Sequence, residues 1–249
     1  MSAVSLSDRD GEVFDLSFLK PRTFAIDQRK RFLDAQYDSD RVKVQALTRV
    51  PGASLISGLL SQQECTRLVE IAEEIGWMKT CGIGPAAGKD GKSAPSKCVL
   101  QVSVPETLEL SNRVIGKVDF SSFCPDRLVG INSRFRMHKY EAGFALGPHY
   151  DRGEYSGTAV DDDGELRFDY FGDGRTSRMS LLIYLNQDCE GGATNFLKDD
   201  EIFESVLPVP GDAVCFFHGS HHLSPLHEGA LVRDGVKYIV RTDFLFVEE

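Results

Sequence analysis

From Asp126 to the C-terminus the chain is a succession of short strand-like segments, and this pattern constrains the fold more than any other feature. Segments such as SRMSLLIYLN, GDAVCFFH and VKYIVRTDFLF are rich in aliphatic and aromatic residues and are separated by turn residues. Two helical stretches precede them. Several short strands after two helices predict a mainly β protein with flanking helices, as in a β-sandwich or jelly roll.

The first helical stretch has clear ends. Ser61 and Glu64 have the spacing of a capping box, in which each side chain satisfies a free backbone amide of the other. Apolar residues then recur at helical spacing until Gly76. A second amphipathic helix is expected from about Glu106 to Val118, and the Gly-, Lys- and Ser-rich segment 82–97 is expected to be a loop.

The N-terminal residues differ in character from the rest of the chain. Residues 1–48 are polar and of mixed charge, so we expect an extension, able to pack on the core, before a single domain at 49–249. The segment RKRFLDAQ at 29–36 is expected to form a short helix. Residues 126–249, where the strands concentrate, are expected to form the core of the domain.

Composition excludes some partners. A net charge of −10 argues against a general nucleic-acid binder or an anionic-membrane binder, and it suits a neutral or basic substrate. No apolar run approaches the length of a membrane span, and the N-terminus lacks the basic-then-apolar order of a signal peptide. The six cysteines show no paired short spacing, which indicates reduced thiols. These features predict a cytoplasmic protein.

His149 and Asp151 form the most informative pair of polar residues. Residues two apart on a strand point to the same side, so both side chains can bind one metal ion. A second histidine from a neighbouring strand would complete a face of two nitrogens and one carboxylate oxygen. Such a face leaves coordination positions open and is typical of non-haem Fe(II) oxygenases.

The second histidine is ambiguous by composition alone, because four histidines lie between residues 218 and 227. His218, His221 and His222 belong to a loop-like segment, where polar side chains are usually solvated, and His227 follows. Lys237 and Arg241 lie beyond them at an even spacing, on the same face of one strand. Either cation could anchor the carboxylate of an organic co-substrate.

Several motifs occur in a specific order through the second half of the chain. They are Tyr140-Glu141-x-Gly143, His149-x-Asp151, LLIYLN (181–186), Glu190-Gly191-Gly192-Ala193-Thr194, Pro210-Gly211-Asp212-Ala213, His227-Glu228-Gly229 and Gly235-Val236-Lys237-Tyr238. From about Phe135 to Phe246 this order resembles the catalytic domain of prolyl 4-hydroxylase-type, 2-oxoglutarate- and Fe(II)-dependent dioxygenases. The segment LSQQECTRLVEIAEE (60–74) also resembles the N-terminal support helix of that family.

The resemblance implies a fold and a set of metal ligands. The fold is a double-stranded β-helix, or jelly roll, with supporting helices and a catalytic core at about 126–249. The implied iron ligands are His149, Asp151 and His227. The strands would supply the frame, whereas the metal and the co-substrate would supply the oxidative chemistry.

The resemblance also implies co-substrate contacts. Lys237, ten residues past His227, corresponds to the base that pairs with the distal carboxylate of 2-oxoglutarate. Many relatives end in a tryptophan-containing strand, whereas this chain has Arg241-Thr242-Asp243, so Arg241 is the rival anchor. Tyr140 and Tyr184 stand where family members often place further co-substrate contacts.

The activity implied by the resemblance is hydroxylation of an unactivated C–H bond, with molecular oxygen as co-reactant and ascorbate as an optional reductant. The expected substrate is a prolyl residue of a peptide or protein. Three alternatives stay open: hydroxylation of a free amino acid or other small molecule, a Zn²⁺ or Mn²⁺ jelly-roll hydrolase or isomerase that does not use 2-oxoglutarate, and a metal-free binding module. The acidic connection 152–176 is expected to cover the substrate, through Tyr155, Tyr170 or Phe171.

Overall fold

A computed structural model describes most of the chain. The described residues are 5–7, 13–15, 31–80, 94–153, 155–161, 163 and 165–249. Cys81 and the expected loop up to residue 93 lie outside them, as does the start of the helix expected at 29–36. The loop expected at 82–97 is wrong for residues 94–97, which begin a strand (Ala94–Gln101) that pairs along most of its length with a neighbouring strand. The five described cysteines (Cys65, Cys98, Cys124, Cys189 and Cys215) are free, as the sequence predicts.

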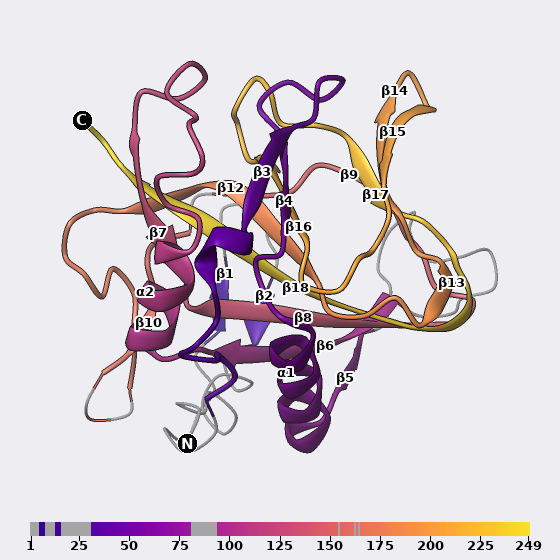
Figure 1. Cartoon of the computed structure of the whole chain (residues 1–249), viewed down its shortest axis with the longest axis horizontal. Coiled ribbons are helices and arrows are strands. Elements are labelled where there is room, and N and C mark those ends of the chain that lie inside the picture. The colour runs from indigo at the N-terminus through magenta and orange to yellow at the C-terminus, as the bar shows by residue number, and fades with distance from the viewer. Residues whose placement is uncertain are drawn as a thin grey trace.

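Two antiparallel sheets form the frame of the molecule (Figure 1). Within the described residues, the larger sheet contains β3 (Lys43–Ala46), β4 (Ser54–Ser57), β16 (Ala213–Phe217), β12 (Thr176–Tyr184), β18 (Val232–Val247), β8 (Arg134–Glu141), β6 (Ala94–Gln101) and β5 (Met78–Thr80) in pairing order, with β7 (Arg127–Ile131) and β13 (Cys189–Gly191) also paired to β18. The smaller sheet contains β15 (Glu201–Val206), β14 (Thr194–Lys198), β17 (His227–Gly229) and β9 (Leu146–His149). Strands distant in sequence therefore become neighbours, and the predicted jelly roll is confirmed.

Two further strand pairs lie outside these sheets. The strands β1 (Ser5–Ser7) and β2 (Val13–Asp15) pair with each other, as do β10 (Ala159–Val160) and β11 (Leu166–Arg167). The second pair belongs to the connection 152–176. This connection is therefore partly structured rather than a continuous loop.

Both helices lie beside the larger sheet. In α1 (Gln62–Ile75) the predicted capping box is present, and Gly76, with φ 92°, ends the helix. The second helix, α2 (Val104–Asn112), begins earlier and ends sooner than the pattern predicts. Ser103 accepts a hydrogen bond from the Glu106 amide and sets the earlier start. Among the described residues, no helix has both the length and the apolar character to cross a membrane.

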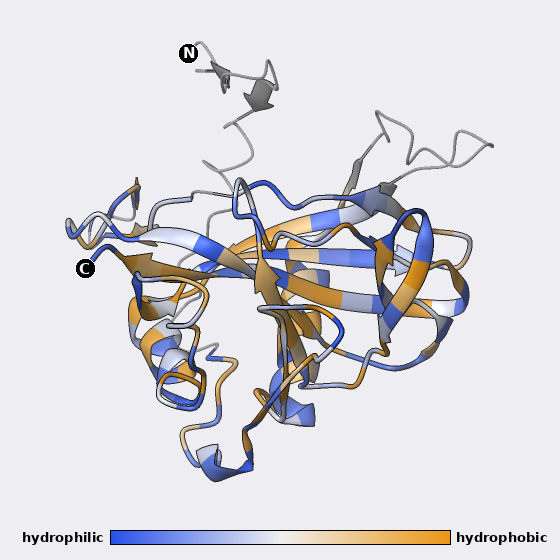
Figure 2. Cartoon of the chain, turned by 90° about the horizontal axis from the view of Figure 1, so that it is seen from above, coloured by the Kyte–Doolittle hydropathy of each residue, from blue (hydrophilic) through white to orange (hydrophobic). Residues whose placement is uncertain are grey.

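The central strand β12 packs against hydrophobic layers on both of its faces. Met179, Leu181 and Ile183 belong to the core on the helix side, whereas Leu182 and Tyr184 belong to the core between the sheets. Figure 2 shows the hydrophobic colour concentrated along the strands. Because β12 is enclosed on both faces, it is held rigidly at the base of the core between the sheets. The polar site lies next to this core.

The short helix expected at 29–36 is wrong for its described residues, which are not helical. The backbone amides of Phe32 and Leu33 donate to the Glu106 carboxylate, and the Asp34 amide donates to Glu64. The Phe32 side chain is fully buried in the core. Tertiary hydrogen bonds and burial replace helical ones here, so this part of the extension packs on the core; the domain division at residue 48 stays a prediction.

A buried ion pair joins the two helical regions. Arg113 donates to both oxygens of the Glu64 carboxylate, at 2.9 and 2.7 Å, and Glu64 also caps α1. The exposed fractions of the two side chains are 4% and 0%. Removal of either partner of such a bidentate pair destabilises the fold, because the remaining charge stays buried without solvent or an opposite charge.

We expect Arg113→Ala to lower the free energy of unfolding by about 3–5 kcal/mol, because it leaves the Glu64 carboxylate buried without its partner. Urea unfolding monitored by circular dichroism measures this change. The matched control is Arg127→Ala, which breaks an exposed pair with Glu249 and should cost less than about 1 kcal/mol. Equal stabilities of the two variants would show that the buried pair is not structural.

Candidate active site

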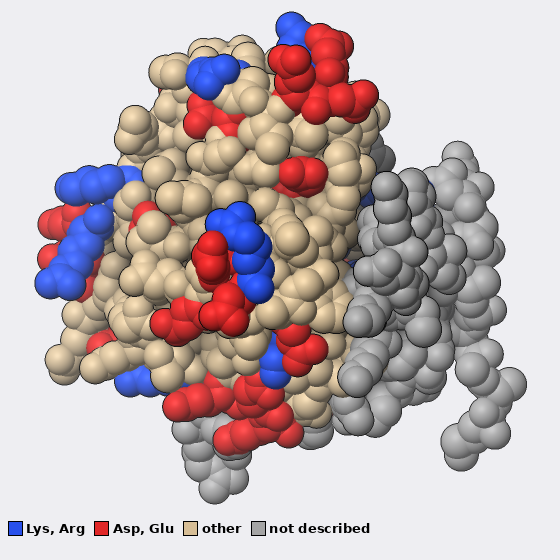
Figure 3. Space-filling view, turned by 90° about the vertical axis from the view of Figure 1, so that its right-hand side faces the viewer, with Lys and Arg blue, Asp and Glu red and all other residues tan. Residues whose placement is uncertain are grey.

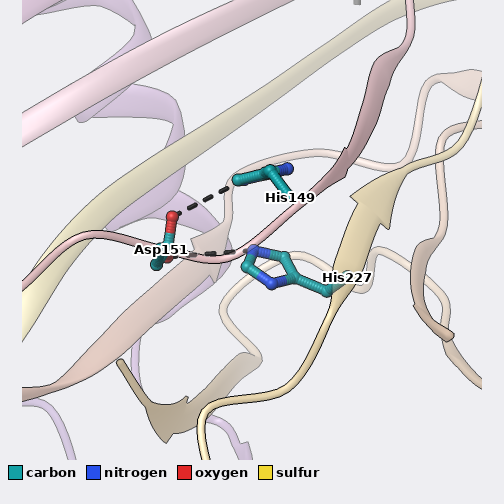
Figure 4. Close-up of side chains that lie close together, drawn as sticks. All are labelled: His149, Asp151 and His227. Atoms are coloured by element: carbon teal, nitrogen blue, oxygen red, sulfur yellow. Dashed lines mark ion pairs between the residues drawn. The ribbon is translucent and has the colours of Figure 1, made fainter. Parts of the chain in front are cut away.

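The side chains of His149, Asp151 and His227 meet where two strands of the smaller sheet pair. His149 ends β9, His227 begins β17, and the two residues are directly paired in the register. One potential ligand atom from each of the three residues lies within 4.8 Å of the others. Nε2 of His149 lies 3.5 Å from Asp151, and Nε2 of His227 lies 3.8 Å from it (Figure 4). Sequence reasoning thus named three residues that the fold brings together.

Backbone carbonyls orient both imidazole rings. Nδ1 of His149 lies 2.9 Å from the Gly147 carbonyl, and Nδ1 of His227 lies 3.1 Å from the Pro225 carbonyl. A proton on each Nδ1 satisfies these carbonyls and leaves each Nε2 lone pair toward Asp151. Burial lowers the pKa of His227 to about 4, so this imidazole is neutral near pH 7. Burial alone would lower the pKa of His149, but Asp151 and the Gly147 carbonyl outweigh burial and raise this pKa above its ordinary value. A metal ion would therefore compete with a proton at His149, and two deprotonated imidazoles with a carboxylate fit a first-row divalent metal ion.

The Asp151 carboxylate is held in its ionised form. Burial alone would raise the pKa of Asp151, but Arg241 and the two histidines outweigh burial and hold this pKa well below its ordinary value. Arg241 Nε lies 3.0 Å from Oδ2 of Asp151, and the Ser180 hydroxyl donates to the same oxygen at 2.6 Å. The carboxylate therefore has a fixed orientation before any ligand arrives.

His218 is not the solvated loop histidine that its sequence context predicts. Its side chain is buried, with Nδ1 at 3.1 Å from the Ser180 hydroxyl and Nε2 at 3.1 Å from the Ser177 hydroxyl. His221 stacks on Phe217, and His222 stacks on His221 and is exposed. None of these three histidines belongs to the three-residue cluster, so the geometry favours His227 as the distal ligand.

We expect Ser180→Ala to weaken divalent-metal binding roughly tenfold, because Asp151 loses the hydroxyl that orients it. Titration with Co²⁺ or Fe²⁺, followed by absorbance or calorimetry, measures the affinity. Ser177→Ala is the control, because its hydroxyl contacts His218 and the Tyr155 amide but not Asp151. Metal affinities that are equal in both variants would remove Ser180 from the positioning of Asp151.

A cavity of about 600 Å³ opens beside the triad. Lys237 lines it and is buried, with an exposed fraction of 2%. Its ammonium donates to the Gly192 carbonyl and forms no ion pair with any carboxylate of the described residues. Burial lowers the pKa of Lys237 to about 8. A desolvated cation that faces a cavity without an anion is suited to binding an anionic ligand.

Gly192 gives Lys237 the room that it needs. Gly192 has a φ of +68°, and a Cβ at this position would lie 2.9 Å from Cδ of Lys237. The contact with Lys237 therefore explains why the second glycine of the Glu190–Thr194 motif cannot be replaced by a larger residue without displacing the lysine side chain. The Lys237 ammonium lies 5.3 Å from the Tyr140 ring centroid and 5.6 Å from that of Tyr184, which stabilises the buried charge.

The remaining expected contacts divide into two groups. Tyr140 lines the cavity, and its hydroxyl lies 3.4 Å from Nδ1 of His138. The Tyr184 hydroxyl instead donates to Thr194, and Thr194, not Tyr184, lines the cavity. Arg241 also lines the cavity but pairs with Asp151, so its charge is already matched. This geometry favours Lys237 over Arg241 as the anchor of a co-substrate.

The connection 152–176 touches the cavity at one aromatic residue. Tyr155 lines it, and the Arg136 guanidinium lies over the Tyr155 ring at 4.7 Å. Tyr170 and Phe171 instead pack on each other, and Phe171 lies against Arg175. The expectation that Tyr170 or Phe171 contacts the substrate is therefore not supported by their positions, and a covering role rests on Tyr155.

Sequence reasoning missed the basic side chains of the cavity wall. Arg134 and Arg136 alternate on β8 with the buried core residues Phe135 and Met137, and they line the cavity together with His138 and Tyr140. The signal was available as a period of two in RFRMHKY. The cavity is thus lined mostly by basic charges, although the chain is acidic. Figure 3 shows one face of the molecule, with clusters of acidic groups at the upper right and at the bottom and others between them. The net charge includes all such groups, so it does not describe the charge of the cavity.

Comparisons with known proteins agree with this geometry. Residues 135–242 match the family model of the 2OG-Fe(II) oxygenase superfamily, a range that includes the triad, Lys237 and Arg241. A probable prolyl 4-hydroxylase 6 from Arabidopsis thaliana is 24% identical over 231 residues, covering 81% of this chain and 72% of that protein.

Two solved structures are also similar. An oxidoreductase of the 2OG-Fe(II) oxygenase family from Burkholderia pseudomallei has a TM-score of 0.52 at 11% identity, covering 80% of this chain and 86% of its own, which supports the fold. A viral collagen prolyl hydroxylase from Paramecium Bursaria Chlorella virus-1 has a TM-score of 0.48 at 18% identity, covering 81% of this chain and 99% of its own.

Proposed function

The chain belongs to the 2OG-Fe(II) oxygenase superfamily, and we propose that it hydroxylates an unactivated C–H bond of a prolyl residue in a peptide or protein. One observation carries the proposal. The three convergent ligand atoms and the buried Lys237 ammonium face the same cavity. This arrangement provides one site for a metal ion and a separate site for a carboxylate.

Each side chain has a defined role in this proposal. His149, Asp151 and His227 would hold Fe(II), and Lys237 would pair with the distal carboxylate of 2-oxoglutarate. Bound iron and 2-oxoglutarate, with molecular oxygen, supply the oxidising chemistry and yield succinate and carbon dioxide. Asp151 keeps its orientation through Arg241 and Ser180.

The walls of the cavity complete the site. Leu182 and Ile239 give it an apolar wall next to Lys237, which excludes water from the co-substrate region. The position of Tyr155 supports a contact with the substrate. Because a prolyl side chain offers only C–H bonds, its recognition must come from the flanking peptide backbone and neighbouring side chains.

Lys237 also separates this function from a Zn²⁺ or Mn²⁺ hydrolase or isomerase. Such an enzyme needs the triad, but its reaction does not require a buried cation without a carboxylate partner, which is costly to bury. A metal-free binding module would likewise need neither the triad nor the orienting contacts of Asp151. The family match over residues 135–242 supports the oxygenase over both alternatives.

The test is a panel of proline-containing peptides, free proline and other free amino acids. Each is incubated with the chain, Fe(II), 2-oxoglutarate and ascorbate, and mass spectrometry detects one added oxygen atom. The proposal predicts an oxygenated peptide whose formation depends on 2-oxoglutarate. Oxygenation of a free amino acid but of no peptide would replace the peptidyl-proline substrate with a small molecule.

A further inference from the structure

The cavity wall carries more positive charge than the proposed reaction uses. Its basic residues are Lys97, Arg134, Arg136, Arg152, Lys237 and Arg241, and its acidic residues are Asp151 and Glu228. This balance is opposite in sign to the net charge of −10 of the whole chain. A cavity rich in one sign of charge attracts ligands of the other sign.

Three of these cations already have a use. Arg241 pairs with Asp151, and Arg136 pairs with the buried Asp243 carboxylate. Lys237 is the proposed anchor of 2-oxoglutarate. Arg241 and Arg136 are therefore neutralised by carboxylates of the chain, and Lys237 is assigned to the co-substrate, so none of the three is left to bind the substrate.

Arg134 is different, because its guanidinium forms no ion pair with any described carboxylate. Its Nε is buried and has no hydrogen-bond partner in the part of the chain that the structure describes. Burial, together with the neighbouring Arg136 and Arg241, lowers the pKa of Arg134. An anion that binds a partly desolvated cation beside other cations is stabilised more strongly by electrostatic attraction than an anion that binds a solvent-exposed arginine.

The position of Arg134 separates it from the co-substrate anchor. Tyr140 pairs in register with Lys237, and Arg136 pairs with Arg241. The order of residues along β8 therefore gives their order along the cavity. Six residues of strand place the Cα of Arg134 roughly 20 Å from that of Tyr140. Arg241, which holds Asp151, lies between the two ends. Arg134 therefore faces the end of the cavity opposite to Lys237.

We propose that Arg134 binds a carboxylate of the substrate, so that the enzyme prefers prolyl substrates carrying an acidic group next to the target ring. This inference rests on the proposed function and specifies its substrate class. A planar guanidinium binds a carboxylate through two parallel hydrogen bonds, which fixes the direction of the chain as well as its charge. Arg136 is held over the Tyr155 ring and by Asp243, so Arg134 is the member of the pair that remains open to a ligand.

The proposed preference reverses the one suggested by net charge. The acidic exterior favours a basic substrate, whereas the cavity selects at close range, where the charges are partly desolvated and interact more strongly. The carboxylate has two sources: an Asp or Glu side chain beside the proline, or the α-carboxylate of a C-terminal proline. Both offer the same chemistry to Arg134.

The experiment compares matched substrates. Peptides with glutamate, glutamine or lysine beside proline carry blocked ends, and a fourth peptide ends in a free C-terminal proline. If the carboxylate comes from a side chain, the proposal predicts a kcat/KM roughly ten- to a hundredfold higher for the glutamate peptide than for the glutamine peptide. If it comes from the chain end, the peptide with a free C-terminal proline should have the same advantage over the glutamine peptide. Arg134→Gln should bring this ratio close to one, whereas Arg127→Gln, outside the cavity, should leave it unchanged.

A charge exchange and a binding measurement decide the outcome. Arg134→Glu should prefer the lysine peptide, a reversal that mere loss of folding does not produce. Calorimetric titration of the Mn(II)- and 2-oxoglutarate-loaded chain gives peptide affinities without turnover. Oxygenation with equal preference for all peptides, or equal affinities in this titration, would overturn the role of Arg134 alone. If no substrate gains oxygen, the proposed function fails, and the affinities still decide whether Arg134 selects carboxylates.

Discussion

Replacement of His227 by alanine is expected to abolish iron-dependent turnover while the chain remains folded. His227 supplies one of the three atoms that converge within 4.8 Å, and the residues that the structure describes offer no fourth ligand in this cluster to replace it. Loss of a residue that only orients a ligand costs 10- to 100-fold in metal affinity, so loss of the ligand itself should cost more than about 100-fold. Metal titration and succinate release measure the two effects.

The control for this variant is another histidine of the same region. His222→Ala should retain metal binding and turnover, because His222 is exposed and stacks on His221 outside the triad. Circular dichroism checks that His227→Ala remains folded, since its ring packs against Phe216 with centroids 4.5 Å apart. Full activity in His227→Ala together with loss of activity in His222→Ala would move the ligand into the 218–222 loop.

Replacement of Lys237 by alanine is expected to raise the 2-oxoglutarate concentration required for half-maximal activity roughly ten- to hundredfold. A charge-assisted hydrogen bond to a carboxylate in a partly dry site contributes about 1.5–3 kcal/mol, which corresponds to this factor. Titration of succinate release against 2-oxoglutarate measures it. Lys198→Ala, at an exposed position at the end of β14, is the control and should titrate like the unmodified chain.

The same lysine predicts the direction of a pH effect. Burial lowers the pKa of Lys237 to about 8, so the free site holds a charged ammonium below this pH and loses the charge as the pH rises through it. The affinity for 2-oxoglutarate should therefore fall above about pH 8 in the unmodified chain and show less change in Lys237→Ala. A normal titration in Lys237→Ala together with a raised requirement in Arg241→Ala would assign the anchor to Arg241.

The features predicted from sequence are those that depend on local chemistry. The capping box at Ser61 and Glu64 is visible because both partners lie within one turn, and the β12 and β18 segments are visible because their composition is typical of strands. The triad is a long-range feature, yet the sequence predicts it, because the order of motifs resembles a known family. The same resemblance favours Lys237 over Arg241.

The features that sequence reasoning missed depend on partners far away in the chain. Phe32 and Leu33 lack a helix because their amides donate to Glu106, more than seventy residues later. His218 is buried because Ser177 and Ser180, on a neighbouring strand, offer it hydrogen bonds. No local pattern encodes such contacts, since tertiary packing overrides segment preference.

The charge of the cavity was misjudged for a related reason. Net charge sums all side chains, whereas binding depends on the few that share a desolvated space. Arg134 and Arg136 meet Arg241 only because β8 pairs with β18. The alternation in RFRMHKY is consistent with one shared face for these arginines, but only the pairing of the strands shows that this face lines the cavity.

The most direct test of the central claim is the fate of labelled oxygen. The reaction is run under ¹⁸O₂ with 2-oxoglutarate and an oxygenated peptide from the panel, and mass spectrometry follows both products. The account predicts one labelled atom in the peptide and one in succinate, formed in equal amounts, with both products lost in His227→Ala. Oxygen derived from water in the peptide, or product formed without consumption of 2-oxoglutarate, would contradict it.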